Sequence, residues 1–448
     1  MAHVAIEIVD AGLVVARDGE VLSPSPGIAL LDPEGVITGR EAAAQARLRP
    51  VLAFDRFWSD LTQDPLPRPL PGAGTRADLA FRHLSSVWQE AAAPGDEALF
   101  ALPGTLRPQE IGLLGGIAAA AAIPVAGQVD AALAACAPLS AGETVLHLDL
   151  QLHQAVLTEL RGEQSLRRQR VDVAPRVGLR ALQSAWAQLV AEAMVRRTRF
   201  DPLHQASTEQ QLYERMPGWL QALGESDSVD AEIDASAGRF GVTLRREQFV
   251  FAVEAYYAQL FELVHGLRRA GEPVTLALSA RAAALPLLGE RCAAMQDIDV
   301  ALLEEGAAAR GALAQAQVLS SAGGAALVTA LARSQPARPA GPAARAAGGT
   351  PPTHVVLGGR AWALSGEPLT IGLAPGRGRA VPLTGPLPGV SRTHCTLAQE
   401  DGQVVVRDHS RHGTWVNGAR VSGSAVLAAG DRLRLGTPGV VLELVAAG

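Results

Sequence analysis

Residues 389–397 read GVSRTHCTL, and residues 408–421 read DHSRHGTWVNGARV. A third stretch, GDRLRLG, follows at residues 430–436. The segments around them are short, alternate apolar with polar residues and are separated by turn residues, a pattern typical of strands joined by loops. Hydroxyl and guanidinium side chains in such loops can donate the charge-assisted hydrogen bonds that hold a phosphate. The pattern predicts an all-β module with an anion-binding loop end.

The three motifs resemble those of the forkhead-associated (FHA) domain, a β-sandwich that binds phosphothreonine peptides. They are similar to the family's G-x-S-R-x-H, D-x-S-x-x-G-T-x-V-N-G and G-D-x-L-x-x-G, in that order. The resemblance implies that Ser391 and Arg392 contact the phosphate and that Thr414 and Asn417 complete the phosphopeptide site, Asn417 by binding the peptide backbone. It implies a structural, loop-bracing role for His394. Three glycines are expected to be structural: Gly372, Gly413 and Gly418.

One position departs from the family pattern. The family usually has a Gly-Arg pair at the end of an early strand, and that arginine contacts the phosphate. Here the pair is Gly372-Leu373, and the next loop carries Arg377 and Arg379, either of which could substitute. Two alternatives stay open: weakened phosphothreonine binding, or binding of an unphosphorylated partner.

A linker divides the chain. Residues 333–353, RSQPARPAGPAARAAGGTPPT, are rich in proline, alanine, glycine and arginine and have no apolar periodicity. This composition is typical of a semi-flexible linker. We therefore expect one domain over residues 1–332, the linker over 333–353 and the FHA domain over 354–448.

The first part alternates short apolar runs with amphipathic stretches. Runs such as 99–102, 144–148 and 274–278 predict buried strands, and the longer stretches 179–196 and 246–268 predict helices by their three-to-four spacing. The alternation predicts an α/β fold with mixed sheets.

The order of segments in the first part resembles the nucleotide-binding domain of the DnaK-type heat-shock chaperones, in the actin-like ATPase superfamily. Similar stretches include IEIVDAGLVVA at 6–16, LFALPGTLRPQE at 99–110, IPVAGQVDAALAA at 123–135 and EEGAAARGALAQA at 304–316. The resemblance implies a two-lobed actin-like fold with ATP and Mg²⁺ in its cleft, between two glycine-rich hairpins. Glycine is needed there because the backbone must approach the phosphates without an intervening Cβ.

The residues that would bind ATP are largely replaced. The first hairpin keeps its acid and one glycine but loses both hydroxyls, and the second keeps only its acid. The chain contains no lysine, so the family's catalytic lysine is absent. By the resemblance, the degenerate nucleotide cleft falls on Asp10, Gly12, Gln128, Asp149 and Ser279. These replacements predict a pseudo-ATPase with no catalytic residue and no cofactor.

Two other interpretations of the first part stay open. A divergent ATP-dependent chaperone-like ATPase, regulated by its FHA domain, could use Asp10, Gly12, Asp149 and arginines such as Arg281, with ATP and Mg²⁺ as cofactors. A filament-forming actin-like protein is neither favoured nor disfavoured. His153 has no partner nearby in the sequence and is expected to be a surface residue.

Composition limits the classes of partner. A net charge of −6, without a basic stripe, argues against nucleic-acid binding. Three well-separated cysteines argue against a disulfide framework or zinc site and favour a reducing, cytoplasmic compartment. The uncharged stretch 111–127 is too short and alanine-rich for a membrane span, and we expect a buried helix followed by a strand. We expect a non-enzymatic adaptor that binds a phosphothreonine-containing protein, with no metal, membrane or nucleic acid.

Overall fold

The computed structural model describes residues 2–70, 72–139, 142–269, 271–333, 351–357, 360–364, 366–375, 378–383, 390–400, 402–410, 413–417, 419–421, 423–436 and 440–446. The chain divides into two compact units, Met1–Gln335 and Pro336–Gly448. Most of the expected linker, residues 334–350, lies outside the described residues.

The first half of unit one is built on a mixed sheet. Its strands, in spatial order, are β19 (Leu327–Val328), β11 (Val125–Asp130), β10 (Glu97–Leu102), β1 (His3–Val9), β2 (Gly12–Arg17) and β3 (Glu20–Val21), with β4 (Ser25–Pro26) also pairing with β2. On β1, Val4, Ile6 and Ile8 enter one buried cluster while Ala5 enters another. Both faces of this sheet are therefore covered, and its strands have nearly continuous apolar runs.

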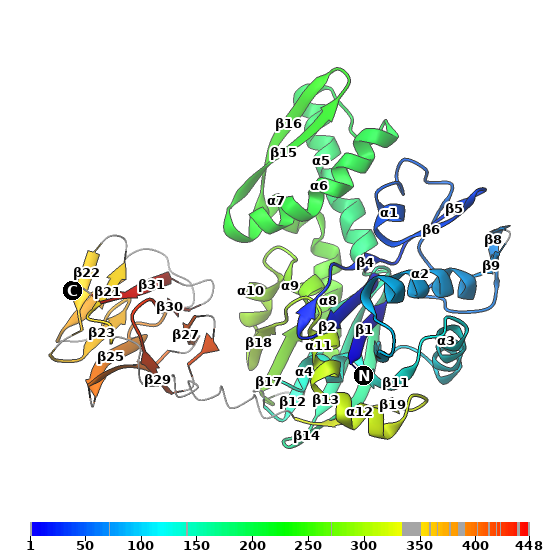
Figure 1. The fold of residues 1–448 in the computed structure, drawn as a ribbon. Helices are drawn as coiled ribbons and strands as arrows, with labels where there is room; N and C mark the ends of the chain where they lie inside the picture. Colours follow the sequence, from blue (N-terminus) through cyan, green and yellow to red (C-terminus); the bar gives the residue numbers. More distant parts are fainter. Residues whose placement is uncertain are drawn as a thin grey trace. The chain divides into compact units, whose positions relative to one another are not determined.

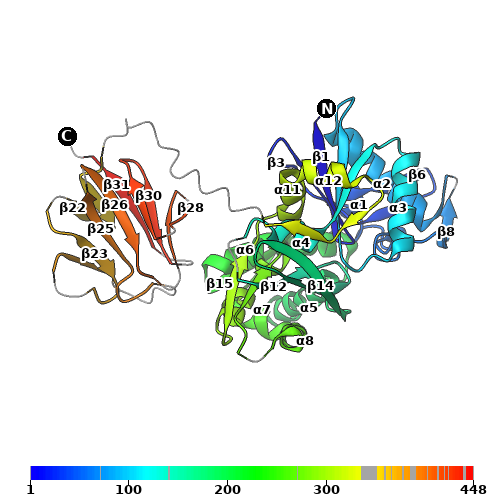
Figure 2. The same ribbon diagram turned by 90° about the horizontal axis from the view of Figure 1, so that it is seen from below.

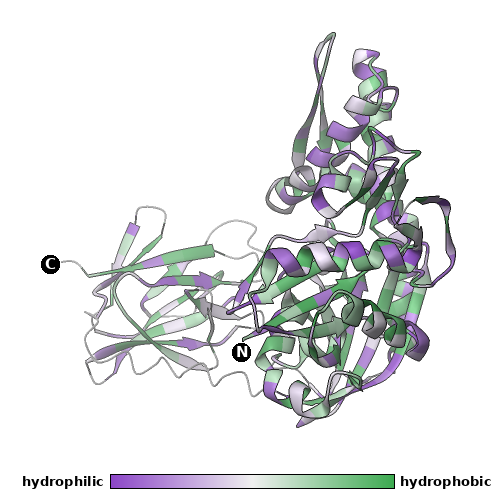
Figure 3. Ribbon diagram, turned by 45° about the vertical axis from the view of Figure 1, so that its right-hand side comes forward, coloured by the Kyte–Doolittle hydropathy of each residue, from purple (hydrophilic) through white to green (hydrophobic). Residues whose placement is uncertain are grey.

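The second half contains another mixed sheet. Its order is β18 (Ile298–Leu302), β17 (Val274–Leu278), β12 (Thr144–Leu150), β13 (Gln154–Arg161), β14 (Ser165–Pro175) and β20 (Ala330–Ala332). Figure 3 shows hydrophobic residues concentrated along the strands in the interior of unit one.

Five strands of each sheet share one topology. In each half the first strand pairs antiparallel with the second and the second with the third, while the fourth and fifth run parallel to the first (β1, β2, β3, β10, β11 and β12, β13, β14, β17, β18). Figures 1 and 2 show the two halves side by side. Unit one is therefore mixed α/β, with an internal structural repeat.

Two alanine-rich helices join the halves. α4 (Ala131–Cys136) follows β11, and α11 (Ala307–Ala314) follows the loop after β18. A Cβ on Gly311 of α11 would lie only 1.9 Å from the carbonyl oxygen of Ala134 of α4. Glycine and alanine thus allow the helices to touch, and one buried cluster includes residues from both helices and both sheets.

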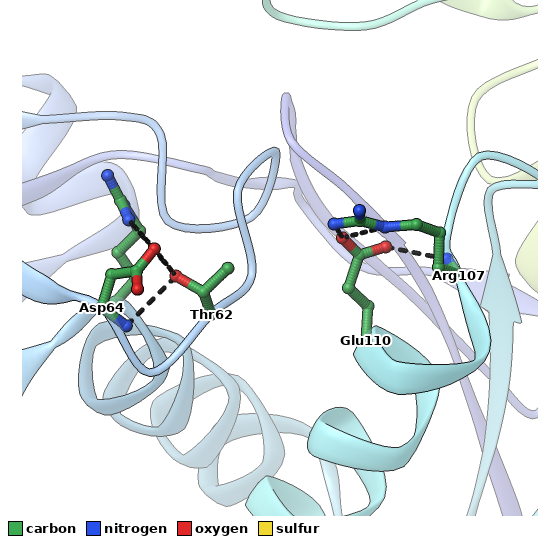
Figure 4. Close-up of polar contacts among 5 residues, drawn as sticks. Thr62, Asp64, Arg107 and Glu110 are labelled. Atoms are coloured by element: carbon green, nitrogen blue, oxygen red, sulfur yellow. Dashed lines mark hydrogen bonds and ion pairs between the residues drawn. The ribbon is translucent and has the colours of Figure 1, made fainter.

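Two capped helices are part of the first half. α2 (Arg76–Ala91) begins with a capping box in which Thr75 and Asp78 satisfy each other's backbone N–H groups. α3 (Pro108–Ala120) begins where the Glu110 carboxylate accepts hydrogen bonds from the backbone and guanidinium of Arg107 (Figure 4). Near the start of α2, Thr62 donates to Asp64. α3 followed by β11 confirms the helix and strand predicted for 111–127.

The second half carries an outer layer, drawn at the top of Figure 1. It contains α5 (Leu179–Thr198), α6 (Ala206–Glu225), the hairpin β15 (Ser228–Ala235) and β16 (Gly238–Arg245), and α7 (Arg246–Ala252). The next helix, α8 (Glu254–Leu267), packs against β13 and β14 of the second sheet. The single helix predicted over 246–268 is wrong, because Val253 leaves the helical conformation (ψ 10°) and separates α7 from α8.

Smaller elements complete unit one. They are β5 (Ala29–Asp32), β6 (Gly35–Thr38), α1 (Gly39–Ala43), β7 (Ala53–Phe54), β8 (Pro65–Leu70), β9 (Ala73–Thr75), α9 (Ala280–Ala283), α10 (Leu288–Ala293) and α12 (Ala316–Ala322). Among the residues described in the whole chain, no helix combines the length and apolar character needed to cross a membrane.

Unit two is β-rich, as predicted. One sheet has the order β22 (Arg360–Ala363), β21 (His354–Leu357), β31 (Val440–Val445), β30 (Arg432–Leu435), β27 (Thr414–Val416) and β28 (Ala419–Arg420). The other has the order β24 (Ala380–Pro382), β23 (Leu369–Gly372), β25 (Cys395–Glu400), β26 (Gln403–Asp408) and β29 (Ser424–Leu427). A single buried cluster takes residues from both sheets, including Val355, Ile371 and Leu433. Two sheets around one core make a β-sandwich.

Candidate functional site

A glycine sets the position of the predicted binding loop in unit two. A Cβ on Gly372, the last residue of β23, would lie 2.1 Å from the carbonyl oxygen of Arg392 and 2.9 Å from that of Ser391. Only glycine permits this approach. The amide of Leu373 donates to the carbonyl of Ser391 (3.1 Å), and that of Ala374 donates to the carbonyl of Arg392 (2.9 Å). The loop is therefore fixed to the end of β23.

His394 connects this loop to the next one. Its ring is fully buried; Nδ1 accepts from the amide of Ser391 (3.0 Å), and Nε2 bonds the carbonyl oxygen of Gly413 (2.9 Å). Gly413 has a φ of 89°, a conformation that favours glycine. These positions fit the structural roles expected of both residues.

Arg392 lies exposed on this braced loop. Among the described residues, its guanidinium makes no hydrogen bond or ion pair. Ser391 is half-buried beside it, and its backbone is held by both Leu373 and His394. The arrangement places an exposed guanidinium on a loop that is held by hydrogen bonds to β23 and His394.

Thr414 and Asn417 both form hydrogen bonds within unit two, and their predicted contact with a ligand stays a prediction. Thr414 is fully buried and its hydroxyl donates to Asp408 (2.8 Å). The Asn417 amide donates to Asp431 (2.7 Å), and its oxygen accepts from the amide of Arg432 (2.8 Å). These hydrogen bonds connect β27 and the residues just after it to Asp408, Asp431 and Arg432.

Two arginines, Arg377 and Arg379, were predicted as possible substitutes for the family's phosphate-binding arginine at position 373. Arg379 is committed elsewhere, since its guanidinium donates to the carbonyl oxygens of Glu367 (3.0 Å) and Ala363 (2.5 Å). Arg377 and Gly418 lie outside the described residues. Leu373 stands beside the loop with 37% of its surface exposed.

Comparison with known families agrees with this geometry. Residues 374–436 match the model of the FHA domain family. Unit two contains an FHA domain. A search of the curated proteins finds no match to the chain. The FHA domain implies a protein partner, and its matched residues begin just after Leu373. They lie wholly within unit two, so the resemblance of unit one to DnaK-type chaperones stays a prediction.

Asp10, one of the predicted cleft residues, lies where the two hairpin turns of unit one meet. The Asp10 carboxylate, after β1, accepts hydrogen bonds from the amides of Leu152 (2.6 Å) and His153 (3.1 Å), after β12. Burial raises the pKa of Asp10, although these hydrogen bonds oppose the rise. A side chain of the protein thus occupies two backbone donors of the second hairpin.

Arg281 connects the two halves of unit one by binding side chains of β1 and β12. Its guanidinium donates to Glu7 of β1 (2.8 Å), to Asp149 of β12 (2.8 Å) and to the carbonyl oxygen of Leu150 (3.0 Å). Burial alone would raise the pKa of Asp149, but the charges of Arg281 and His147 and the hydrogen bonds from Ser279 and Arg281 together hold that pKa below its usual value. Burial lowers the pKa of neighbouring His147. Glu7 was not among the site residues predicted from the sequence, because its position does not belong to any of the motifs recognised there.

His153 is not the isolated surface residue expected. Only 13% of its side chain is exposed, and Nε2 lies 3.4 Å from the carboxylate of Asp55. Asp55 also pairs with Arg180 of α5 (2.6 Å). Asp55 lies just after β7, so a carboxylate of the first half contacts a histidine and an arginine of the second half. No local signal identifies this group, because its members are far apart in the sequence.

The other predicted cleft residues contact neighbouring backbone atoms of unit one. Gln128 is buried and donates to the carbonyl oxygen of Gly324 (2.7 Å). The Ser279 hydroxyl accepts from the amide of Ala282 at the start of α9 (3.4 Å). A Cβ on Gly12 would lie 2.3 Å from the carbonyl oxygen of Ser25. The described residues contain no group of side chains suited to hold a metal ion.

A further contact spans the halves between α1 and α6. The amide of Gln210 donates to the carbonyl oxygen of Ala43 (3.0 Å). Arg47 pairs with Glu209 (3.1 Å), and its guanidinium lies 3.7 Å from the centre of the Tyr213 ring. This face of α6 therefore contacts the first half.

Proposed function

We propose that this protein is a non-enzymatic adaptor whose FHA domain binds a phosphothreonine-containing protein. The observation that carries the proposal is the position of Arg392, exposed on a loop that Gly372 and His394 hold in place within a matched FHA domain. A loop on a rigid β-scaffold is a common place for a recognition site.

The chemistry of Arg392 suits a phosphate. Phosphothreonine carries a charge of about −1.5 to −2 at neutral pH, and guanidinium offers a planar fork of donors to its oxygens. A hydrogen bond to such a charged group contributes about 1.5–3 kcal/mol. Ser391, next to Arg392 on the same loop, is the second proposed contact. Thr414 and Asn417 stabilise the neighbouring loops through hydrogen bonds to Asp408 and Asp431.

The test compares phosphorylated with unphosphorylated peptides of the same sequence. The full chain is titrated with a threonine-centred peptide library in both forms, and bound peptides are sequenced. We expect a preference for the phosphorylated form that Arg392→Ala removes. Arg360→Ala is the matched control, since Arg360 is also exposed in unit two but lies on β22. Equal binding of the two forms by the wild type would favour a phosphorylation-independent interaction module instead.

We further propose that unit one is an actin-like scaffold that neither binds nor hydrolyses ATP. The repeated five-strand topology and the α4–α11 contact support the actin-like part of this proposal. Three features support the loss of ATP: Asp10 bound to the second hairpin, Arg281 held between Glu7 and Asp149, and the absence of lysine from the chain. An anionic phosphate would have to displace the carboxylate from its backbone donors.

The second candidate function is a divergent ATPase regulated by its FHA domain, with ATP and Mg²⁺ as cofactors. Its support is that Asp10 and Asp149 both persist beside the paired hairpin turns. Calorimetric titration with Mg-ATP separates the two candidates: the scaffold predicts no binding heat, whereas an ATPase predicts saturable binding and turnover that Asp149→Ala removes.

A further inference from the structure

Unit one contains a cavity of about 510 Å³ whose lining includes Asp149 and Ser279 of the predicted nucleotide cleft. The rest of its wall comes from the start of α5, the second half of α6, residues 279–290 and residues 303–308, with Glu7 of β1, His147 of β12, Arg246 and two residues of α4. Small-molecule sites in proteins commonly have volumes of roughly 300–1,000 Å³. The cavity is therefore large enough for an organic ligand.

The inner wall of the cavity is apolar. Trp186 and Met216 are buried there, and Leu220, Leu285 and Pro286 extend the same wall. The indole nitrogen of Trp186 already donates to the carbonyl oxygen of Phe249 (2.9 Å). This wall favours a ligand with an apolar body, because burying one removes apolar surface from water.

The charges that line the cavity have a negative balance. Five carboxylates (Glu7, Asp149, Glu290, Glu304 and Glu305) face two arginines (Arg246 and Arg281). Both arginines are already paired, Arg246 with Asp227 (3.0 Å) and Arg281 with two of the five carboxylates.

Two exposed carboxylates of the cavity remain uncompensated. Glu304 pairs with Arg310 (3.0 Å). Glu290 and Glu305 make no ion pair within the described part of the chain. A cationic group placed near them gains attraction, whereas a triphosphate is repelled.

We propose that this cavity binds a small organic cation with an apolar body and rejects nucleoside triphosphates. The apolar part lies against the wall of Met216 and Leu285, and the cationic part faces Glu290 and Glu305. The amides of Gln183 and Gln221 also line the cavity and can bond polar atoms of the ligand. This inference is independent of the FHA domain.

Two probes of matched shape and opposite charge test the inference. Tryptamine carries an ammonium on an indole-ethyl body, and indole-3-propionate carries a carboxylate on the same body. Each is titrated into the full chain and followed by calorimetry and thermal unfolding. We expect tryptamine to bind about tenfold or more tightly than indole-3-propionate, and its affinity to fall as salt is added.

Substitutions in the wall of the cavity test whether tryptamine binds there. Glu290→Gln and Glu305→Gln should each weaken tryptamine binding by about three- to fivefold, the range expected for exposed charges. Ala284→Trp, at an exposed lining position, should abolish binding without disturbing the core. Glu262→Gln is the control, because Glu262 is exposed on α8 away from the cavity. Undetectable binding of tryptamine at millimolar concentration, or equal binding of indole-3-propionate or Mg-ATP, overturns the inference.

Discussion

The carboxylate of Asp10 lies 2.6 Å from the backbone nitrogen of Leu152, so the turn after β1 is bonded directly to the turn after β12. The residues are 142 positions apart in the sequence. In the resembled family, hairpins at these positions hold a phosphate between them. Here the Asp10 carboxylate accepts hydrogen bonds from two backbone amides of the second turn, those of Leu152 and His153.

The wild-type chain is expected to show no saturable Mg-ATP binding and no ATP turnover. The physical reason is that a phosphate would meet the Asp10 carboxylate at the amides of Leu152 and His153. Calorimetry and a phosphate-release assay on the full chain measure both properties. Micromolar affinity, together with turnover lost in Asp149→Ala, would contradict this prediction.

Arg281→Ala is expected to lower the free energy of unfolding of unit one by about 3 kcal/mol, because it leaves Glu7 and Asp149 buried without their shared cation. Urea unfolding followed by tryptophan fluorescence measures the change. The control is Arg196→Ala, which removes an exposed i,i+4 pair with Glu192 and should cost less than about 0.5 kcal/mol. Similar losses in the two variants would contradict a buried bridge.

His153 is expected to make stability depend on pH. Burial lowers the pKa of His153, but its hydrogen bond to Asp55 and the charges of Asp55 and Asp10 outweigh burial and raise it above the usual 6.5. The charged ring therefore stabilises the fold below its unfolded pKa, and this contribution is lost as pH rises through the folded pKa.

The measurement is the difference in melting temperature between the wild type and His153→Gln. It should be larger near about pH 5.5 than near about pH 8.5. His204→Gln, at an exposed histidine, is the control and should show no such trend. A difference in melting temperature that grows as pH rises would contradict the prediction that the charged form of His153 stabilises the fold.

Leu373→Arg is expected to raise the affinity for phosphothreonine peptides by roughly tenfold, because it adds a second charged donor beside Ser391 and Arg392. Fluorescence anisotropy with a phosphorylated peptide selected from the library measures the gain. The unphosphorylated form of the peptide is the control. A variant that still does not discriminate between the two forms would count against a phosphate site.

Thr414→Val is expected to lower the free energy of unfolding of unit two by about 1–3 kcal/mol, since it removes the buried partner of Asp408. Thermal unfolding of the full chain measures this loss. Phosphopeptide discrimination by the folded fraction should persist, in contrast to Arg392→Ala. A folded Thr414→Val variant that loses discrimination would restore Thr414 as a ligand contact.

Much of the fold could be predicted from local patterns. Apolar runs identified strands such as β10, β12 and β17, and the FHA motifs indicated the β-sandwich. The break between α7 and α8 was missed because the apolar periodicity continues through Val253. The spacing of the motifs identified Ser391 and Arg392 of the binding loop and Thr414 of β27 as site residues. It could not predict that Arg392 is exposed whereas Thr414 is buried.

The sequence by itself determined the features that depend on neighbouring residues: strand and helix type, the glycines at close approaches such as Gly372, and the missing lysine. Only the tertiary structure decided which charges meet. Arg281 lies 274 residues from Glu7, and His153 lies 98 residues from Asp55, yet each pair is in contact. Charge pairing and burial depend on distance in space, and the packing of two sheets around α4 and α11 sets that distance.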